Sequence, residues 1–366
     1  MDADAARLDA LRAEIARCDE EVLAAVARRL DAAAELGRIK SARGLPVRNF
    51  PVEAQVLERL RAGCAARGVD PELGDAMAGL LIDHAVKLQS GLVDRPAGGE
   101  QGEAVVVGGR GKMGRWLCAY LRAGGHRVRV LDPASGPADD DLEAIASLDE
   151  AAGAGLLVLA TPISSIPALL GRLDPNRHTG LVLDIASLKS PLVEPLRGAA
   201  TRGLRVASLH PMFGPDVAHL IGRNVLFCDC GAPGALAEAK QLFVGVGAQL
   251  VDVPLDEHDR HMGYVLGLAH LVNILYGRVL GASGLDYRRL GEVASTTFGK
   301  QNATARDVLR ENPDLYFEIQ QLNATTPALA GQLHAALDEI LGAVAAGDRE
   351  TFRRIMDDGR NYFLGG

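Results

Sequence analysis

The chain has 366 residues, of which 48% are hydrophobic and 23% charged, so it is long enough for two or three folded domains. A formal net charge of −8 argues against a nucleic-acid partner, which needs a clustered basic face. The five cysteines lack the paired spacing of a zinc site, so we expect reduced thiols, no metal and a cytoplasmic location. Without a leader-like start or a run of about 18 apolar residues, we expect no membrane association.

The first 90 residues predict three helices and no strand. Apolar side chains recur every three or four residues over 5–43, which indicates one long amphipathic helix. A second helix is expected over 52–67, and a third begins at Pro71 after the N-cap Asp70 and reaches about Gln89. A long helix with an apolar stripe and no third layer needs a cover, so we expect a homodimer with intertwined helices.

The stretch "VDRPAGGEQGE" then separates helix-only sequence from strands that alternate with helices. Short β-branched runs such as "AVVV", "RVRVLD" and "GLLVLATP" predict a doubly wound parallel Rossmann sheet. Beyond it the strand signals stop and a helical region continues to the end, where we expect substrate binding and dimerisation. The expected organisation is an all-α module over 1–92, a linker over 93–103, an α/β domain over 104–254 and an all-α domain over 255–366.

A glycine loop, "VVVGGRGKMGRWL", follows the first of these strands and opens a helix. Gly109, Gly111 and Gly114 have the spacing that allows a tight turn, close approach of a pyrophosphate and helix packing on the strand. Asp132 ends the next strand, where a carboxylate binds the ribose hydroxyl of NAD and repels the 2′-phosphate of NADP. Arg127 and Arg129 lie nearby and keep NADP open as an alternative.

Longer motifs show a family resemblance. "GGRGKMG", "DIASLKSPL", "LHPMFGPD" and "EHDRHMGYVLGLAH" resemble the prephenate dehydrogenases, and "LRAEIARCDEEVLAAVARRL", "ELGRIKSARGLPVR" and "HAVKLQ" resemble the all-helical chorismate mutases. In this order the two resemble the fused enzymes of tyrosine biosynthesis. The resemblance implies rearrangement of chorismate to prephenate, followed by NAD-dependent oxidative decarboxylation to 4-hydroxyphenylpyruvate.

For the dehydrogenase, the resemblance implies that His210 accepts the proton of the substrate's C4 hydroxyl. Ser187 would hydrogen-bond the C4 substituent and help seat the nicotinamide, His270 would contact the substrate side chain, and Asp259 would orient a neighbouring base or cation. The cation for the ring carboxylate would be Arg306 or, as a weaker substitute, Lys300. The expected cofactor-binding residues are Gly109, Arg110, Gly111, Lys112, Met113, Gly114, Asp132, Thr161 and Pro162.

The mutase reaction rearranges a dianion and needs cations for two carboxylates and a donor for the ether oxygen. The resemblance assigns these tasks to five residues: Arg12, Arg29, Lys40, Glu53 and Gln89. On one helix, Arg29 and Lys40 share a face about 16 Å apart, whereas Arg12 lies roughly 25 Å from Arg29 and a quarter turn away. We therefore expect Arg12 to come from the partner chain.

Three positions depart from the family pattern: Val52 replaces an arginine before Glu53, Ala85 replaces a serine, and Asp307 stands where the ring-carboxylate arginine belongs. Arg306 would serve only if its helix carried a one-residue shift. One interpretation is drift in an ordinary tyrosine-pathway enzyme. Another is a preference for 4-amino-4-deoxychorismate and 4-amino-4-deoxyprephenate, because losing a cation beside Glu53 favours an ammonium group.

Two further alternatives stay open on the residues. The helical module could be an inactive scaffold or sensor attached to a working dehydrogenase, although a scaffold needs none of the five mutase residues. The chain could also be a generic nicotinamide reductase in which the turn containing His210 has only a structural role.

Overall fold

The computed structural model describes residues 3–43, 49–90, 102–134, 142–217, 220, 223–244, 246 and 248–364. The chain divides into two compact units. The first contains Met1–Thr161, Ser165–Ala186 and Pro195–Val253. The second contains Pro162–Ser164, Ser187–Glu194 and Pro254–Gly366. Two short segments that follow strands of the sheet thus pack with the C-terminal helices. Most of the predicted linker lies outside the described residues, and the predicted domain boundaries stay predictions.

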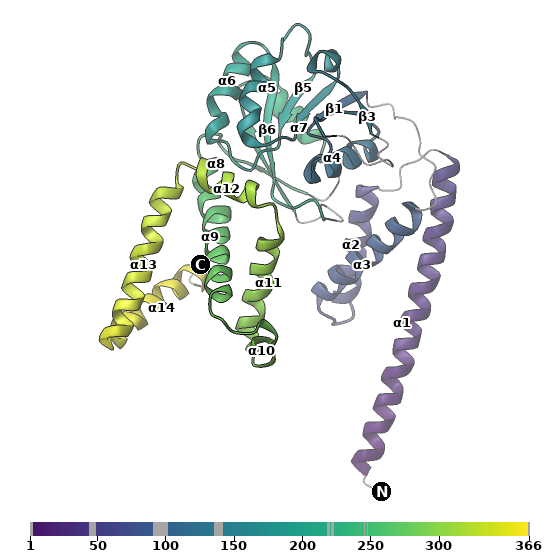
Figure 1. The fold of residues 1–366 in the computed structure, drawn as a ribbon. Helices are drawn as coiled ribbons and strands as arrows, with labels where there is room; N and C mark the ends of the chain where they lie inside the picture. The colour runs from purple at the N-terminus through teal and green to yellow at the C-terminus, as the bar shows by residue number, and fades with distance from the viewer. Residues whose placement is uncertain are drawn as a thin grey trace. The chain divides into compact units, whose positions relative to one another are not determined.

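Three helices form the N-terminal module, as predicted: α1 (Ala3–Ala42), α2 (Phe50–Ala65) and α3 (Pro71–Ser90). Asp70 caps α3 as expected, because its carboxylate accepts the N–H of Glu72 at 2.9 Å. The first half of α1 projects beyond α2 and α3 (Figure 1), and all its described side chains up to residue 25 are exposed. An apolar stripe of Leu8, Leu11, Ile15 and Val22 lies along this half without a cover within the described chain.

The first unit also contains an eight-stranded sheet with the order β3-β2-β1-β4-β5-β6-β7-β8. The strands are β1 (Glu103–Val107), β2 (Arg127–Leu131), β3 (Glu143–Ala144), β4 (Leu156–Leu159), β5 (Leu181–Asp184), β6 (Arg205–Pro211), β7 (Asn224–Asp229) and β8 (Gln249–Asp252). The order reverses between β1 and β4, which is where doubly wound sheets bind ligands at their carboxyl ends. The predicted Rossmann architecture is confirmed.

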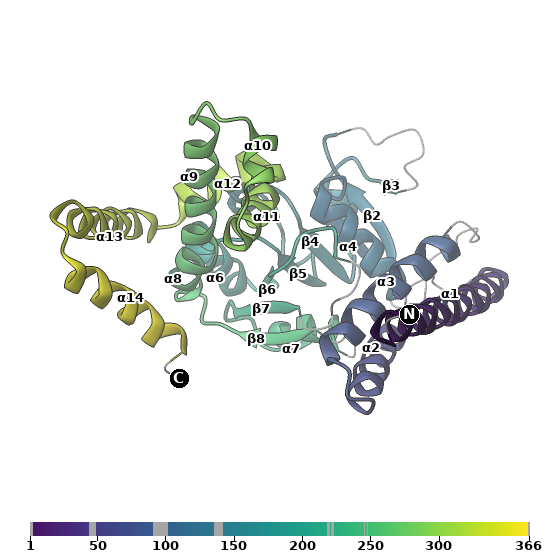
Figure 2. The same cartoon turned by 90° about the horizontal axis from the view of Figure 1, so that it is seen from below.

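The helices of this sheet region are α4 (Lys112–Ala123), α5 (Ile166–Arg172), α6 (Val193–Thr201) and α7 (Ala235–Gln241). Helix α4 lies beside β1 and β2 (Figure 2). Strands β7 and β8 carried no prediction of their own, and β7 runs antiparallel to β6. Its register pairs His210 with Leu226, and His210 is the last residue but one of β6, next to the loop that follows the strand.

The C-terminal part of the second unit is all-helical, as predicted (Figure 1). Its helices are α8 (His258–Met262), α9 (Ala269–Gly281), α10 (Tyr287–Glu292), α11 (Thr296–Arg310), α12 (Pro313–Leu322), α13 (Thr326–Ala346) and α14 (Arg349–Leu364). A π-helical segment, Gly263–Leu268, joins α8 to α9. Amide and phenol groups link α9 to α11: Gln301 donates to Asn273 at 2.9 Å and Tyr276 to Asn302 at 2.8 Å.

One helical stretch of this unit, His258–Gly281, is long and apolar enough by length and composition to cross a membrane, contrary to our reading of the sequence. Only 17% of its most apolar window is buried. Four exposed side chains, Val265, Val272, Leu275 and Val279, follow one another at helical spacing along one face. This face needs a cover from outside the described chain.

Candidate active sites

The glycine loop lies at the carboxyl end of β1, next to the end of β4. A Cβ on Gly109 would lie 2.4 Å from a methyl carbon of Val130, and one on Gly114 would lie 2.1 Å from the carbonyl oxygen of Gly108. Both glycines are therefore required by packing alone. A Cβ on Gly111 would meet only the Gly108 oxygen, at 3.4 Å, so the protein itself leaves room there. That room fits a pyrophosphate approaching the backbone at the start of α4.

Asp132 follows β2 and ties the loop in place. Its carboxylate accepts the N–H of Arg110 at 2.8 Å and that of Ala134 at 2.9 Å. The Arg110 guanidinium donates in turn to the carbonyl oxygen of Ala134 at 3.0 Å. Thr161 lies after β4 and accepts a hydrogen bond from Ser165 at 2.9 Å. Lys112 and Pro162 are exposed and Met113 is half-buried. The residues present therefore fit NAD at this end of the sheet.

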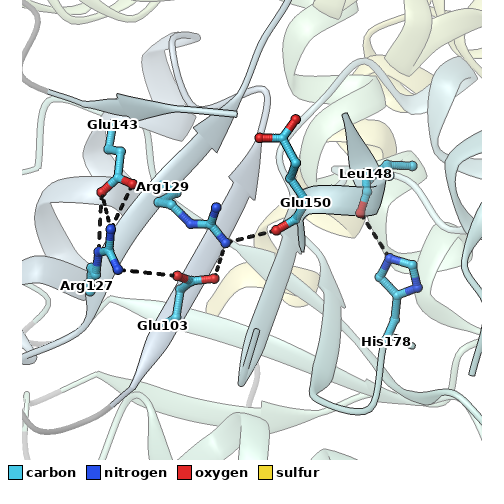
Figure 3. Close-up of polar contacts among 7 residues, drawn as sticks. All are labelled: Glu103, Arg127, Arg129, Glu143, Leu148, Glu150 and His178. Carbon is cyan, nitrogen blue, oxygen red and sulfur yellow. Dashed lines mark hydrogen bonds and ion pairs between the residues drawn. The ribbon is translucent and has the colours of Figure 1, made fainter. Parts of the chain in front are cut away.

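Arg127 and Arg129, which left NADP as an alternative cofactor, form ion pairs with glutamates of the sheet (Figure 3). Arg127 forms a two-pronged ion pair with Glu143, with N···O distances of 2.8 Å from its Nη2 atom. Arg129 pairs with Glu103 and donates to the carbonyl oxygen of Glu150 at 2.9 Å. Both arginines are thus paired with carboxylates of the neighbouring strands β1 and β3.

His210 is buried on β6, between β5 and β7. His210 belongs to the first unit, whereas Ser187 and His270 belong to the second, and the proximity of these three side chains stays a prediction.

In the second unit, Asp259 holds the segment that follows Ser187. Its carboxylate accepts the backbone N–H of Lys189 at 2.8 Å and of Ser190 at 2.6 Å, and lies 2.6 Å from Nδ1 of the buried His258. Burial acts to raise the pKa of Asp259, but the hydrogen bonds from His258, Ser190 and Lys189 outweigh it, and the pKa is lowered overall. Asp259 therefore holds a backbone segment and lies beside His258, and its role towards a base or cation of the active site stays a prediction.

Glu318 on α12 makes a similar connection that sequence reasoning missed. It accepts the hydroxyl of Ser164 at 2.9 Å and the N–H of Ile163 at 3.3 Å. These residues directly follow the predicted cofactor-binding residues Thr161 and Pro162. A sequence separation of more than 150 residues leaves no local signal for this contact.

His270, at the start of α9, stacks on Tyr316 with ring centroids 4.2 Å apart. Its Nδ1 atom is buried without a hydrogen-bond partner among the described residues. Burial lowers the pKa of His270 to about 4, so the ring is neutral at physiological pH. A neutral imidazole can hydrogen-bond a substrate there without adding charge.

The cation for the ring carboxylate is sought on α11, which is a continuous α-helix over Thr296–Arg310. The one-residue shift that would carry Arg306 to the position of Asp307 is therefore absent from this helix. Arg306 still follows Asn302 by four residues and shares its side of α11, whereas Lys300 and Asp307 lie on the opposite side. Both basic side chains are exposed. Lys300, seven residues before Asp307, therefore shares the side of Asp307 and Arg306 does not, and the choice between these two cations stays a prediction.

The mutase residues gather along the parallel pair α1 and α3. The Arg29 guanidinium donates to the carbonyl oxygen of Leu81 at 2.9 Å, and the Lys40 ammonium donates to Oε1 of Gln89 at 3.3 Å. Burial lowers the pKa of Lys40 while the charge of nearby Glu53 raises it, so these two side chains face each other. Glu53 and Gln89 are buried, unlike ordinary surface residues.

Gly37 explains how Gln89 fits against α1. A Cβ at Gly37 would lie 2.8 Å from Cγ of Gln89, so glycine makes room for that side chain. Arg12, in contrast, is exposed and pairs with Asp9 of its own helix at 3.2 Å. Lys40, Glu53 and Gln89 thus lie together within one chain, Arg29 contacts α3 further along, and Arg12 does not join them.

Comparison with known proteins follows the same division. Residues 11–90 match the type II chorismate mutases, 121–252 the nucleotide-binding domain of prephenate dehydrogenase and 254–358 its dimerization domain. A T-protein of Enterobacter agglomerans is 28% identical over 347 residues, which cover 95% of this chain and 90% of that protein. A 4-amino-4-deoxyprephenate dehydrogenase of Streptomyces pristinaespiralis is 31% identical over 272 residues, 70% of this chain and 89% of that one.

Among solved structures, prephenate dehydrogenase from A. aeolicus in complex with hydroxyphenyl propionate and NAD+ has a TM-score of 0.58 and 17% identity, and covers 72% of this chain and 98% of that one. This likeness shows the fold. A glycine loop on a doubly wound sheet, followed by a helical unit and preceded by a three-helix module, defines an NAD-dependent dehydrogenase fused to a helical mutase. The chain belongs to the family that joins a chorismate mutase to a prephenate dehydrogenase.

The enzyme therefore isomerises chorismate to prephenate and oxidatively decarboxylates prephenate with NAD, in tyrosine biosynthesis. The family match to the nucleotide-binding domain begins after the glycine loop, so the geometry of that loop is the independent argument for the cofactor.

Two glycine variants separate packing from cofactor binding. Gly114→Ala places a methyl group against the Gly108 oxygen and is expected to lower the free energy of unfolding by about 2 kcal/mol. Gly111→Ala is expected to change it by less than about 1 kcal/mol but to weaken NAD binding at least about tenfold. Calorimetric unfolding and NAD titration measure both quantities, and wild-type NAD affinity in Gly111→Ala would contradict the assignment.

The lowered pKa of His270 predicts a pH dependence of stability. Between pH 6.5 and about 4 the unfolded chain takes up a proton on His270 that the folded chain does not, so stability is lost as pH falls through this window. Urea unfolding at pH 7 and pH 5 should show a smaller loss for His270→Gln than for wild type. The exposed His334→Gln serves as the control, and equal losses in all three proteins would refute the interpretation.

Proposed function

We propose that His210 is the proton acceptor of the dehydrogenase reaction. Its burial on β6, at the end of the sheet that carries the cofactor loop, supports this role. An imidazole can accept a proton near neutral pH, which is what the C4 hydroxyl must release. NAD, when bound, accepts the hydride that leaves C4. His210 takes the hydroxyl proton as the ring carboxylate departs as carbon dioxide, and returns it to the resulting phenolate oxygen.

The surrounding residues position the substrate in this proposal. Asp259 fixes the backbone beside Ser187, so that the Ser187 hydroxyl can bond the C4 substituent. Neutral His270 contacts the side-chain end of the substrate, and Arg306 or Lys300 binds the ring carboxylate. For the cofactor, the Gly111 backbone takes the pyrophosphate and Asp132 the ribose.

Removing the base tests this assignment. His210→Asn is expected to lower kcat of the dehydrogenase by about 10²- to 10⁴-fold, the usual contribution of a positioned general base. The mutase activity of the same protein should be unchanged, since its residues lie on α1 to α3, and it reports on folding and concentration. Dehydrogenase activity within threefold of wild type would show that another group accepts the proton.

The mutase site is completed by a second copy in our proposal. Arg29 and Lys40 both reach from α1 to α3, where Lys40 meets Gln89, whereas Arg12 lies on the uncovered half of α1. A second α1 packed on this apolar stripe would cover it and bring a second Arg12 towards the pocket. The exposed stripe on α9 has the same explanation, because it lies in the region that matches a dimerization domain. Buried polar groups such as Asp259 and Asn273 within His258–Gly281 argue against lipid as its cover.

We further propose that the enzyme works in the cytoplasm, because its five cysteines are scattered along the sequence without the spacing of a disulfide framework.

Mixing two inactive variants tests the shared mutase site. Arg12→Ala and Arg29→Ala are each expected to lose most mutase activity. After unfolding and refolding together in equal amounts, half of the dimers are mixed, and each mixed dimer has one intact site. About one quarter of wild-type activity should return. No recovery, with dehydrogenase activity intact in both variants, would show that Arg12 acts within its own chain.

A preference for 4-amino substrates is the second candidate, favoured by the Streptomyces pristinaespiralis relative. The structure weakens the charge argument for it, because Lys40 lies near Glu53 and a cation remains there despite Val52. The purified enzyme with NAD should reduce the cofactor with chorismate, and absorbance at 340 nm follows it. Signal only from 4-amino-4-deoxychorismate would reverse the assignment.

The variant Val52→Arg tests the same substrate preference by changing the enzyme instead of the substrate. If the charge near Glu53 sets the preference, the variant should shift the ratio of kcat/KM between the hydroxy and amino substrates towards the hydroxy substrate by about tenfold. A neutral, larger variant of the same position, Val52→Leu, is the control. An unchanged ratio would mean that Val52 has no part in substrate choice.

A further inference from the structure

Aromatic side chains are scarce in this chain, with one tryptophan, six tyrosines and eight phenylalanines. Five of them nevertheless form one continuous column in the first unit. The successive ring centroids are 5.0 Å apart from Phe213 to Trp116, 5.2 Å from Trp116 to Tyr120, 5.3 Å from Tyr120 to Phe243 and 5.9 Å from Phe243 to Phe227. A concentration of this kind, in a chain that is 4% aromatic, calls for a specific explanation.

One end of the column is fixed. Phe227 and Phe243 are buried, and the Tyr120 hydroxyl donates to the carbonyl oxygen of Leu242 at 2.5 Å. Phe227 lies on β7 directly opposite Leu209 of β6, next to the pair of Leu226 with His210. The buried end of the column is therefore part of the strand pairing that contains His210.

The other end of the column is Phe213, which also lies close to His210 in the sequence. Phe213 lies three residues after His210, in the loop beyond β6, and packs edge-on against Trp116 with an interplanar angle of 64°. Both rings are half-buried. Leu209 and Pro211, the two neighbours of His210, line the same apolar pocket as Trp116 and Tyr120. The segment from Leu209 to Phe213 is thus held by β7 on one side and by Trp116 on the other.

Trp116 belongs to α4, the helix that begins at the glycine loop. It is the fifth residue of that helix. The helix whose first turn binds the cofactor's pyrophosphate in our proposal therefore also carries the ring that packs against the loop after His210. Edge-to-face aromatic contacts have a preferred geometry, which an aliphatic contact of equal area lacks. A general base must be held to within about 0.5 Å of its productive position.

We propose that Trp116 is a positioning residue for the dehydrogenase, which fixes the loop after His210 through its edge-on contact with Phe213. The inference rests on the proposed role of His210. It differs from ordinary core packing in a measurable way: loss of the contact should slow the chemical step at temperatures at which the protein remains fully folded.

The test compares Trp116→Leu with Trp116→Phe, which keeps a ring. Trp116→Leu should lower dehydrogenase kcat about tenfold while KM for NAD and for prephenate changes less than about twofold. Trp116→Phe should restore kcat to within about twofold of wild type. Mutase activity and the thermal midpoint of each variant verify that it is folded.

Phe213→Leu removes the contact from the other side and covers the case in which Trp116→Leu fails to fold. It should give the same fall in kcat, and the double variant should be little slower than either single one. Tyr120→Phe is the matched control, because it removes the hydrogen bond to Leu242 but keeps every ring. It should lower the thermal midpoint without lowering kcat.

Two results would overturn the proposal. Wild-type kcat in folded Trp116→Leu and Phe213→Leu would show that the column only packs the core. A rise in KM for NAD with unchanged kcat would show that Trp116 supports cofactor binding alone. His210→Asn, measured alongside, separates failure of the proposed base from failure of the positioning role. If His210→Asn stays active, the proposed base is wrong. If His210→Asn is inactive while Trp116→Leu has normal activity, only the positioning role is wrong.

Discussion

The dehydrogenase depends on how closely backbone approaches backbone at the carboxyl ends of β1 and β4. Gly108 has a φ of 80°, and a Cβ there would lie 2.4 Å from the carbonyl oxygen of Ala160. With Gly114 pressed on the same turn, α4 can begin at only one place. The point at which α4 begins determines three features: the open backbone at Gly111, the hydrogen bond between the loop and Asp132, and the position of Trp116.

Acidic side chains organise the second unit in a comparable way. Asp259 holds the backbone that follows β5, and Glu318 holds the backbone that follows β4. Both carboxylates accept N–H groups that begin short helical turns, an arrangement that favours negative charge. Segments leading from the sheet are thus ordered by carboxylates of the C-terminal helices.

Much of the fold could be predicted from the sequence, because several of its elements follow from local residue patterns. Periodicity gave α1 to α3 within a few residues, and the spacing of Gly109, Gly111 and Gly114 with Asp132 gave the cofactor loop. Contacts between distant segments were not predictable, such as Glu318 with Ser164, Gly37 with Gln89 and Trp116 with Phe213, because no local pattern encodes them. The direction of β7 was missed for the same reason. The charge argument at Val52 overlooked Lys40, which approaches Glu53 only in the folded module.

The uncovered stripes on α1 and α9 have a joint consequence for assembly. Suppose that the same two chains pair along both stripes. Once they have associated at one stripe, pairing at the second stripe is intramolecular, and its strength depends on the effective concentration that the connecting chain allows. A weak helix pairing at α1 would then persist at protein concentrations far below its own dissociation constant. Separating the two halves of the chain would expose that weakness, so the covalent fusion itself would sustain the mutase as a dimer through avidity.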